Sequence, residues 1–90
     1  KELPKNAKML TLFSWMNTKN GSDRVMISKK IFGYNYYGKF YNGILNEYKG
    51  EKIGKGTILV PAEHSSIFYK LFRQYRIKVV IKTIIEIDSH

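Results

Sequence analysis

Hydrophobic and polar positions alternate along the first third of the chain, and the pattern predicts strands. Residues 8–16, KMLTLFSWM, form a short apolar and aromatic run that suits a buried strand. The dipeptide Asn20-Gly21 tolerates the positive φ angles of a tight hairpin turn. A returning strand is therefore expected from Asp23, where the segment DRVMISKKIF alternates apolar and polar residues.

Glycines punctuate the middle of the chain, at positions 33, 38, 43 and 50. Because each glycine costs a helix about 1 kcal/mol relative to alanine, this region is expected to be extended, with bends or bulges. Residues 39–48, KFYNGILNEY, then form a third strand, and residues 52–60, KIGKGTILV, form a fourth.

The period changes after Pro61, which suits the first turn of a helix. Over residues 61–76 the apolar side chains recur every three or four positions and predict one amphipathic helix. They are Ile67, Phe68, Leu71, Phe72 and Tyr75. Residues 77–87 return to a period of two, with five side chains expected to point inward. These are Ile77, Val79, Ile81, Ile85 and Ile87.

Together these elements predict an α+β fold of about five mostly antiparallel strands, with one amphipathic helix before the last strand. The order is β-β-β-β-α-β, forming a curled sheet or a small barrel. Ninety residues fit a single domain over residues 1–90, with residues 1–7 as a flexible lead. The chain opens at Lys1 rather than Met, which is also compatible with a fragment of a longer protein.

The charge balance narrows the classes of partner. Sixteen Lys and Arg against seven Asp and Glu give a net charge of +9, and such a field attracts polyanions. No run is long and apolar enough to span a bilayer, and there is no cysteine for a disulfide or a thiolate metal site. These features favour a soluble, intracellular protein and leave the compartment open.

Several kinds of chemistry find little support. The histidines, His64 and His90, lack the spacing of a zinc site, and no cofactor motif is present, so neither metal nor cofactor is expected. Residues 50–56, GEKIGKG, have one residue too few between the glycines for a phosphate-binding loop. A small basic ribonuclease stays open as an alternative, with His64, Arg73 and Arg76 as its catalytic candidates, although such folds usually begin with a helix.

The stretch from Lys30 to Tyr37, KIFGYNYY, partly resembles the aromatic strand of RNA-recognition and cold-shock domains. The positions that match in residue type are Lys30, Phe32, Gly33, Tyr34 and Tyr37. Ile31 and Asn35 depart from the motif, and residues 17–22 leave no room for the helix that an RNA-recognition domain needs between its first two strands. The resemblance implies a base-stacking strand; family membership is not inferred from it.

On a strand, Phe32, Tyr34 and Tyr36 share one face, and exposed rings on such a face stack on nucleic-acid bases. Alternatively, some of these rings form the core. We expect Phe32, Phe40 and Ile44 inside and several of the tyrosines at least half exposed, since a buried phenol hydroxyl needs a hydrogen-bond partner.

The sequence therefore predicts a non-catalytic module that binds single-stranded DNA or RNA by phosphate contacts and base stacking. The predicted binding residues are Lys29, Lys30, Tyr34, Tyr36, Tyr37, Lys39, Tyr41, Lys52, Lys55 and Arg73. A protein-interaction module or inhibitor that binds an acidic partner is the main alternative, because exposed tyrosines also suit protein interfaces. An exposed edge strand, for example residues 8–16, would in addition permit homodimerisation by sheet extension.

Overall fold

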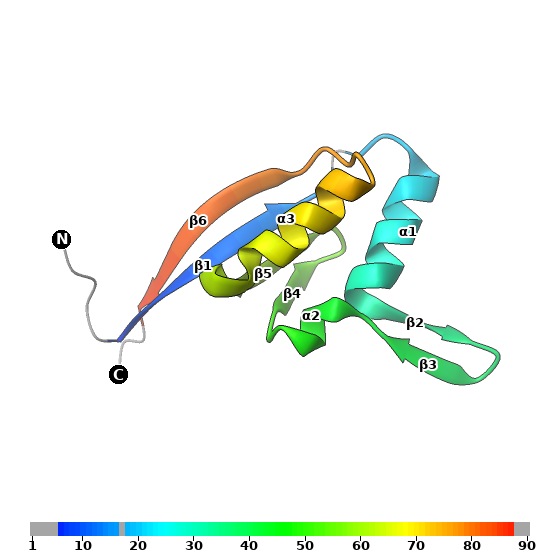
Figure 1. Ribbon diagram of the computed structural model, residues 1–90, viewed down its shortest axis with the longest axis horizontal. Helices are drawn as coiled ribbons and strands as arrows, with labels where there is room; N and C mark the ends of the chain where they lie inside the picture. The colour runs from blue at the N-terminus through cyan, green and yellow to red at the C-terminus, as the bar shows by residue number, and fades with distance from the viewer. Residues whose placement is uncertain (1–5, 17, 88–90) are drawn as a thin grey trace.

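The computed structural model describes residues 6–16 and 18–87, and it confirms the predicted α+β class (Figure 1). A four-stranded antiparallel sheet has the order β4-β5-β1-β6, and a separate two-stranded hairpin pairs β2 with β3. The strands are β1 (Ala7–Ser14), β2 (Gly33–Tyr36), β3 (Lys39–Asn42), β4 (Glu51–Gly54), β5 (Thr57–Pro61) and β6 (Val80–Ile87). The helices are α1 (Gly21–Phe32), α2 (Ile44–Glu47), the 3-10 turn η1 (Ala62–His64) and α3 (Ser65–Gln74).

The predicted helix before the last strand is present, as η1 followed by α3. Its apolar stripe lies on the sheet, where Phe68 and Phe72 are fully buried and their rings contact Phe13 of β1. Burial of three such rings in one cluster contributes several kcal/mol to a domain of this size. The sheet is open, with β4 and β6 at its edges. Of the two predicted forms, the curled sheet is therefore confirmed and the closed barrel is wrong.

The segment expected as a returning strand from Asp23 is the helix α1, and this prediction was wrong. Asn20 caps the helix: its side-chain oxygen accepts hydrogen bonds from the backbone N–H groups of Ser22 and Asp23, at 2.9 and 3.3 Å. At the other end the N–H of Gly33 donates to the Lys29 carbonyl, with Gly33 at a φ of 91°. Asn20-Gly21 therefore begins a helix instead of forming a hairpin turn.

The two following strands are also shorter than predicted. Residues 39–48 are extended only as far as Asn42, because α2 begins at Ile44. Residues 52–60 contain two strands, β4 and β5, which pair with each other across a turn with a shift in register. The chain thus has more and shorter strands than the predicted meander.

The run 8–16, expected as a buried strand, contains most of β1, which lies inside the sheet, paired with β5 on one side and β6 on the other. It is therefore not the exposed edge that dimerisation through this strand would need. β6 is the edge strand, and three of its side chains predicted to point inward are exposed: Ile81, Ile85 and Ile87. Of the predicted flexible lead, residues 1–5 lie outside the described part, and Ala7 already belongs to β1.

Candidate nucleic-acid interface

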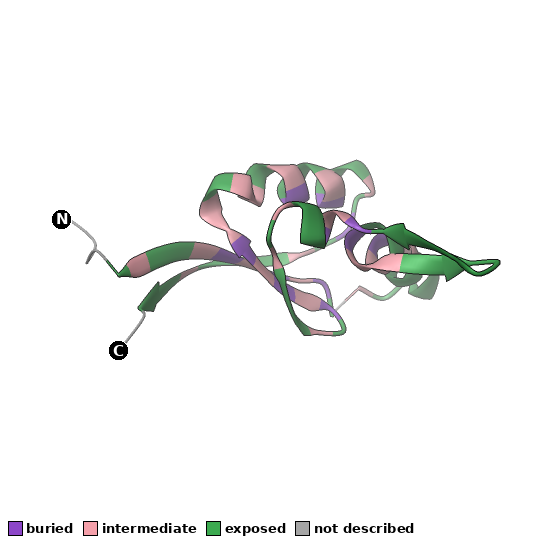
Figure 2. Cartoon of the chain, turned by 90° about the horizontal axis from the view of Figure 1, so that it is seen from below, coloured by how far each residue is buried: buried purple, intermediate pink, exposed green. Residues whose placement is uncertain are grey.

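The hairpin β2–β3 projects from the body of the molecule at the end of α1, and its residues are mostly exposed (Figures 1 and 2). A side chain at Gly33 would overlap the Tyr41 carbonyl oxygen, and one at Gly43 would overlap the Ile31 carbonyl group. These two glycines therefore allow both ends of the hairpin to meet the last turn of α1. The arrangement fixes the hairpin's aromatic residues beside the lysines of that turn.

One face of the hairpin carries a pair of stacked tyrosines. Tyr34 lies opposite Tyr41 in the strand register, and their rings stack with centroids 5.1 Å apart at an interplanar angle of 16°. The ammonium group of Lys29 lies 5.7 Å from the Tyr34 ring centroid, and that of Lys39 lies 5.3 Å from the Tyr41 centroid. Tyr36 follows on the same face and is 57% exposed. Rings and cations thus alternate over one surface.

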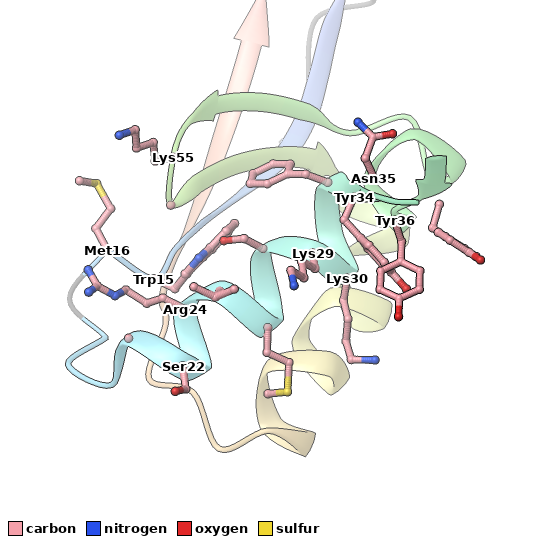
Figure 3. A pocket seen from close by; sticks show the side chains of 18 residues that line it. Trp15, Met16, Ser22, Arg24, Lys29, Lys30, Tyr34, Asn35, Tyr36 and Lys55 are labelled. Atoms are coloured by element: carbon pink, nitrogen blue, oxygen red, sulfur yellow. The ribbon is translucent and has the colours of Figure 1, made fainter. Parts of the chain in front are cut away.

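A groove runs along α1 from its first turn to this hairpin face (Figure 3). Arg24 and Met16 lie at one end, Tyr34 and Tyr36 at the other, and Lys55 comes from the turn between β4 and β5. No Asp or Glu lines the groove within the described part of the chain. The groove therefore combines positive charge with aromatic surface.

Six of the ten predicted binding residues line this groove: Lys29, Lys30, Tyr34, Tyr36, Tyr41 and Lys55. The ammonium group of Lys30 lies 5.3 Å from the ring centroid of Tyr75, which follows α3, so this side chain also contacts a residue outside the groove. Lys39 adjoins the groove through its contact with Tyr41.

The other three predicted residues lie outside the groove lining. Lys52 covers Phe32, with its ammonium group 4.6 Å from the ring centroid. Tyr37 lies in the turn of the hairpin and is 91% exposed. Arg73 is in the last turn of α3 and does not line the groove.

The predicted face of Phe32, Tyr34 and Tyr36 is not formed. Phe32 is the last residue of α1, where it packs on Trp15 with ring centroids 5.9 Å apart. Lys30–Phe32 belong to α1, so the segment that resembled the aromatic strand of RNA-recognition domains is only partly a strand. The sequence also predicted no helix between the first two strands, because residues 17–22 are too few, whereas α1 occupies that place. Phe40, expected in the core, is 52% exposed, whereas Phe32 and Ile44 are partly buried against the core.

Among the basic residues that line the groove, Arg24 is the one that sequence patterning missed. The helical character of its segment was signalled by Asn20 three residues before Asp23, by Lys29 and Lys30 in the last turn, and by Gly33 just after it. A helix places Arg24 one turn before Ser28, and both line the groove.

The ribonuclease candidates are not brought together. His64 lies at the start of α3, where its ring packs against Tyr48 at 5.2 Å, and Arg73 lies in the last turn. A rise of 1.5 Å per residue separates their backbones by about 13 Å along the helix, and Arg76 lies in the turn just after it. His90 is outside the described residues.

Among the described residues, no three acidic or histidine side chains cluster in a way that could hold a metal ion. None of the helices in this part of the chain is both long and apolar enough to cross a membrane. Comparison with protein-family models, with curated proteins and with solved structures found no match to this chain.

Proposed function

We propose that the protein binds single-stranded nucleic acid in the groove along α1, with bases on the hairpin tyrosines. The observation that carries the proposal is the joint lining of one groove by basic and aromatic side chains, without a carboxylate among its described residues. The four cations are Arg24, Lys29, Lys30 and Lys55, and the exposed rings are Tyr34, Tyr36 and Tyr41.

Charge supplies the sequence-independent part of this binding. If each of the four groove cations meets one phosphate, the logarithm of the binding constant falls with the logarithm of the salt concentration with a slope of about −2.8. Neutralising one of them should make the slope less negative by about 0.7. Lys29→Gln is the suitable variant, with Lys70→Gln on the exposed face of α3 as its matched control.

Stacking supplies the preference for unpaired bases. A base on an exposed ring contributes about 1–3 kcal/mol, and duplex bases offer their faces only to each other. Tyr36 is the ring to test because it is exposed and its contact is with the neighbouring Tyr37, not with the core. Tyr69 of α3 is a matched control, since it is exposed to a similar degree and lies outside the groove.

The experiment measures anisotropy of labelled single-stranded DNA and RNA at two or more salt concentrations. We expect Tyr36→Ala to weaken binding by about five- to a hundredfold, while Tyr69→Ala changes it less than twofold. Labelling the oligonucleotide is preferable to intrinsic fluorescence, because the single tryptophan, Trp15, is buried and will not report stacking directly.

Heparin separates stacking from simple charge attraction. It is a polyanion without bases, so equal affinities for heparin and for single-stranded DNA or RNA would overturn the proposal. Equal losses with Tyr36→Ala and Tyr69→Ala would do the same. Absence of binding to every nucleic acid, together with binding to an acidic protein, would favour the interaction-module alternative.

A further inference from the structure

The two edges of the four-stranded sheet are unlike each other. β4 is four residues long, ends at Gly54 and has an irregular register with β5, features that discourage another strand from pairing with it. β6 is eight residues long and pairs with β1 in continuous register along its whole length. No other strand of the described chain pairs with the outer side of β6.

The side chains of β6 also suit a partner strand. Six of its eight residues are β-branched, and most of its isoleucines are exposed, with Ile85 at 48% and Ile87 at 55%. Such residues favour strands because they pack against cross-strand neighbours. The remaining two residues are Lys82 and Glu86, which lie on one face of the strand.

We propose that two copies of this chain associate through antiparallel pairing of their β6 strands. A two-fold axis perpendicular to the sheet reverses the strand direction and keeps each sheet face on its own side. It therefore joins the two sheets into one of eight strands, with both α3 helices on the same face. The charges on β6 select where the axis passes.

With the axis at Ile84, Lys82 lies opposite the partner's Glu86, and the symmetry makes this pair twice. The β-branched residues also meet one another: Ile84 lies opposite the partner's Ile84, Ile81 opposite the partner's Ile87, and Thr83 opposite the partner's Ile85. Opposite charges and apolar pairs across strands each contribute about 0.2–1 kcal/mol.

Counting only pairs formed within Val80–Ile87, the neighbouring registers are worse. Moving the axis to residue 83 places Lys82 opposite the partner's Ile84, and moving it to residue 85 places Glu86 opposite the partner's Ile84. Moving it to residue 82 or 86 places like charges opposite each other. Glu86 also lies opposite Lys8 of β1 within one chain. In the Ile84 register it is therefore flanked by a cation on both sides. This inference is independent of nucleic-acid binding.

Charge reversal tests the register. Lys82→Glu places a second carboxylate opposite the partner's Glu86, and Glu86→Lys places a second ammonium group opposite the partner's Lys82. Each variant alone should therefore dimerise at least about tenfold more weakly than the wild type.

Mixing the two variants in equal amounts restores the charge pairing. In a heterodimer, both pairs again place opposite charges face to face. The mixture should form heterodimers with an affinity close to that of the wild type. Lys70→Glu, the same change on the exposed face of α3, should leave dimerisation unchanged.

Sedimentation equilibrium over a range of concentrations gives the association constants. A wild-type chain that stays monomeric at its solubility limit would overturn the proposal, as would a mixture that associates no better than either variant alone. Because Glu86→Lys also places a lysine opposite Lys8, its fold should be checked by circular dichroism. Amide hydrogen exchange of the wild type needs no variant: protection of β6, but not of β4, should rise with protein concentration.

Discussion

The sheet with α3 and the region of α1 with the hairpin use their aromatic residues in opposite ways. In the first, Phe13, Phe68 and Phe72 are fully buried, and the Phe13 ring contacts both of the others. In the second, the tyrosines of the hairpin lie at the surface beside lysines. None of the seven tyrosines, all of them in described residues, is fully buried. Phenylalanine carries no polar atom and suits a dry core, whereas a phenol hydroxyl needs water or a partner.

This contrast indicates that one region mainly stabilises the fold and the other is available for binding. The sheet and α3 supply five of the ten buried hydrophobic side chains among the described residues, namely Phe13, Ile58, Val60, Phe68 and Phe72. The hairpin strands β2 and β3 supply none, and their exposed side chains are free to serve binding, as exposed segments on a packed scaffold often do. Three substitutions probe the division, from the largest expected effect on stability to the smallest.

Phe72→Ala should be the most damaging change. Phe72 is 1% exposed and packs on both Phe13 and Trp15, with ring centroids 5.5 and 5.3 Å away. Removing such a ring costs about 3–5 kcal/mol of unfolding free energy, a large share of the total stability of a small domain. Urea denaturation followed by circular dichroism measures the loss.

Phe40→Ala is the control for this prediction, because it deletes the same side chain from the hairpin, where it is half exposed. We expect a loss of about 1 kcal/mol or less. Equal losses for the two variants would contradict the division between a stabilising core and a lightly packed hairpin.

Sequence patterning succeeded where burial is one-sided and failed where two periods fit the same residues. The stripe containing Phe68 and Phe72 is long and regular, so α3 was predictable. In α1 only Ile27 and Ile31 are buried, while the apolar Val25 is exposed. The apolar positions 25, 27 and 31 fit the period of two of a strand. The buried pair 27 and 31 fits the helical spacing of four equally well, so alternation alone favoured a strand.

The candidate site was predictable in composition but not in assembly. The density of tyrosines and lysines in residues 29–41 is visible in the sequence, and most of these residues do line one groove. Lys55 comes from the distant turn between β4 and β5, and Arg24 comes from the helix that was predicted as a strand. Both depend on tertiary packing, which a local pattern does not record.

Asn20→Ala should have an intermediate effect, confined to α1. The substitution removes the side-chain oxygen that accepts two backbone N–H groups, and loss of such a cap costs about 1 kcal/mol. The first turn, which carries Arg24, should fray, and single-stranded DNA should bind a few-fold more weakly. Hydrogen exchange of the α1 amides and oligonucleotide anisotropy measure the two effects. Asn46→Ala, in the exposed part of α2, is the control and should change neither beyond experimental error.

Tyr37→Asn should have the smallest effect on stability. We expect it to stabilise the hairpin while weakening the binding of single-stranded nucleic acid. Tyr37 and Gly38 form the two-residue turn of the hairpin, with φ angles of 50° and 80°. Positive φ at both positions is the requirement of the type I′ turn, for which Asn-Gly is the preferred dipeptide. A tyrosine there is strained, and its ring contacts only Tyr36 among the described aromatic residues, in an edge-on pair 4.4 Å apart.

Relief of that strain should stabilise the hairpin by about 0.5–1 kcal/mol, seen as slower hydrogen exchange of the β2 and β3 amides. If the exposed ring is there to meet bases, the same variant should bind single-stranded DNA or RNA more weakly, although its turn is better formed. A more stable hairpin with undiminished affinity would remove Tyr37 from the binding surface and confine that surface to the groove. A less stable hairpin would show that the contact between Tyr36 and Tyr37 outweighs the backbone strain.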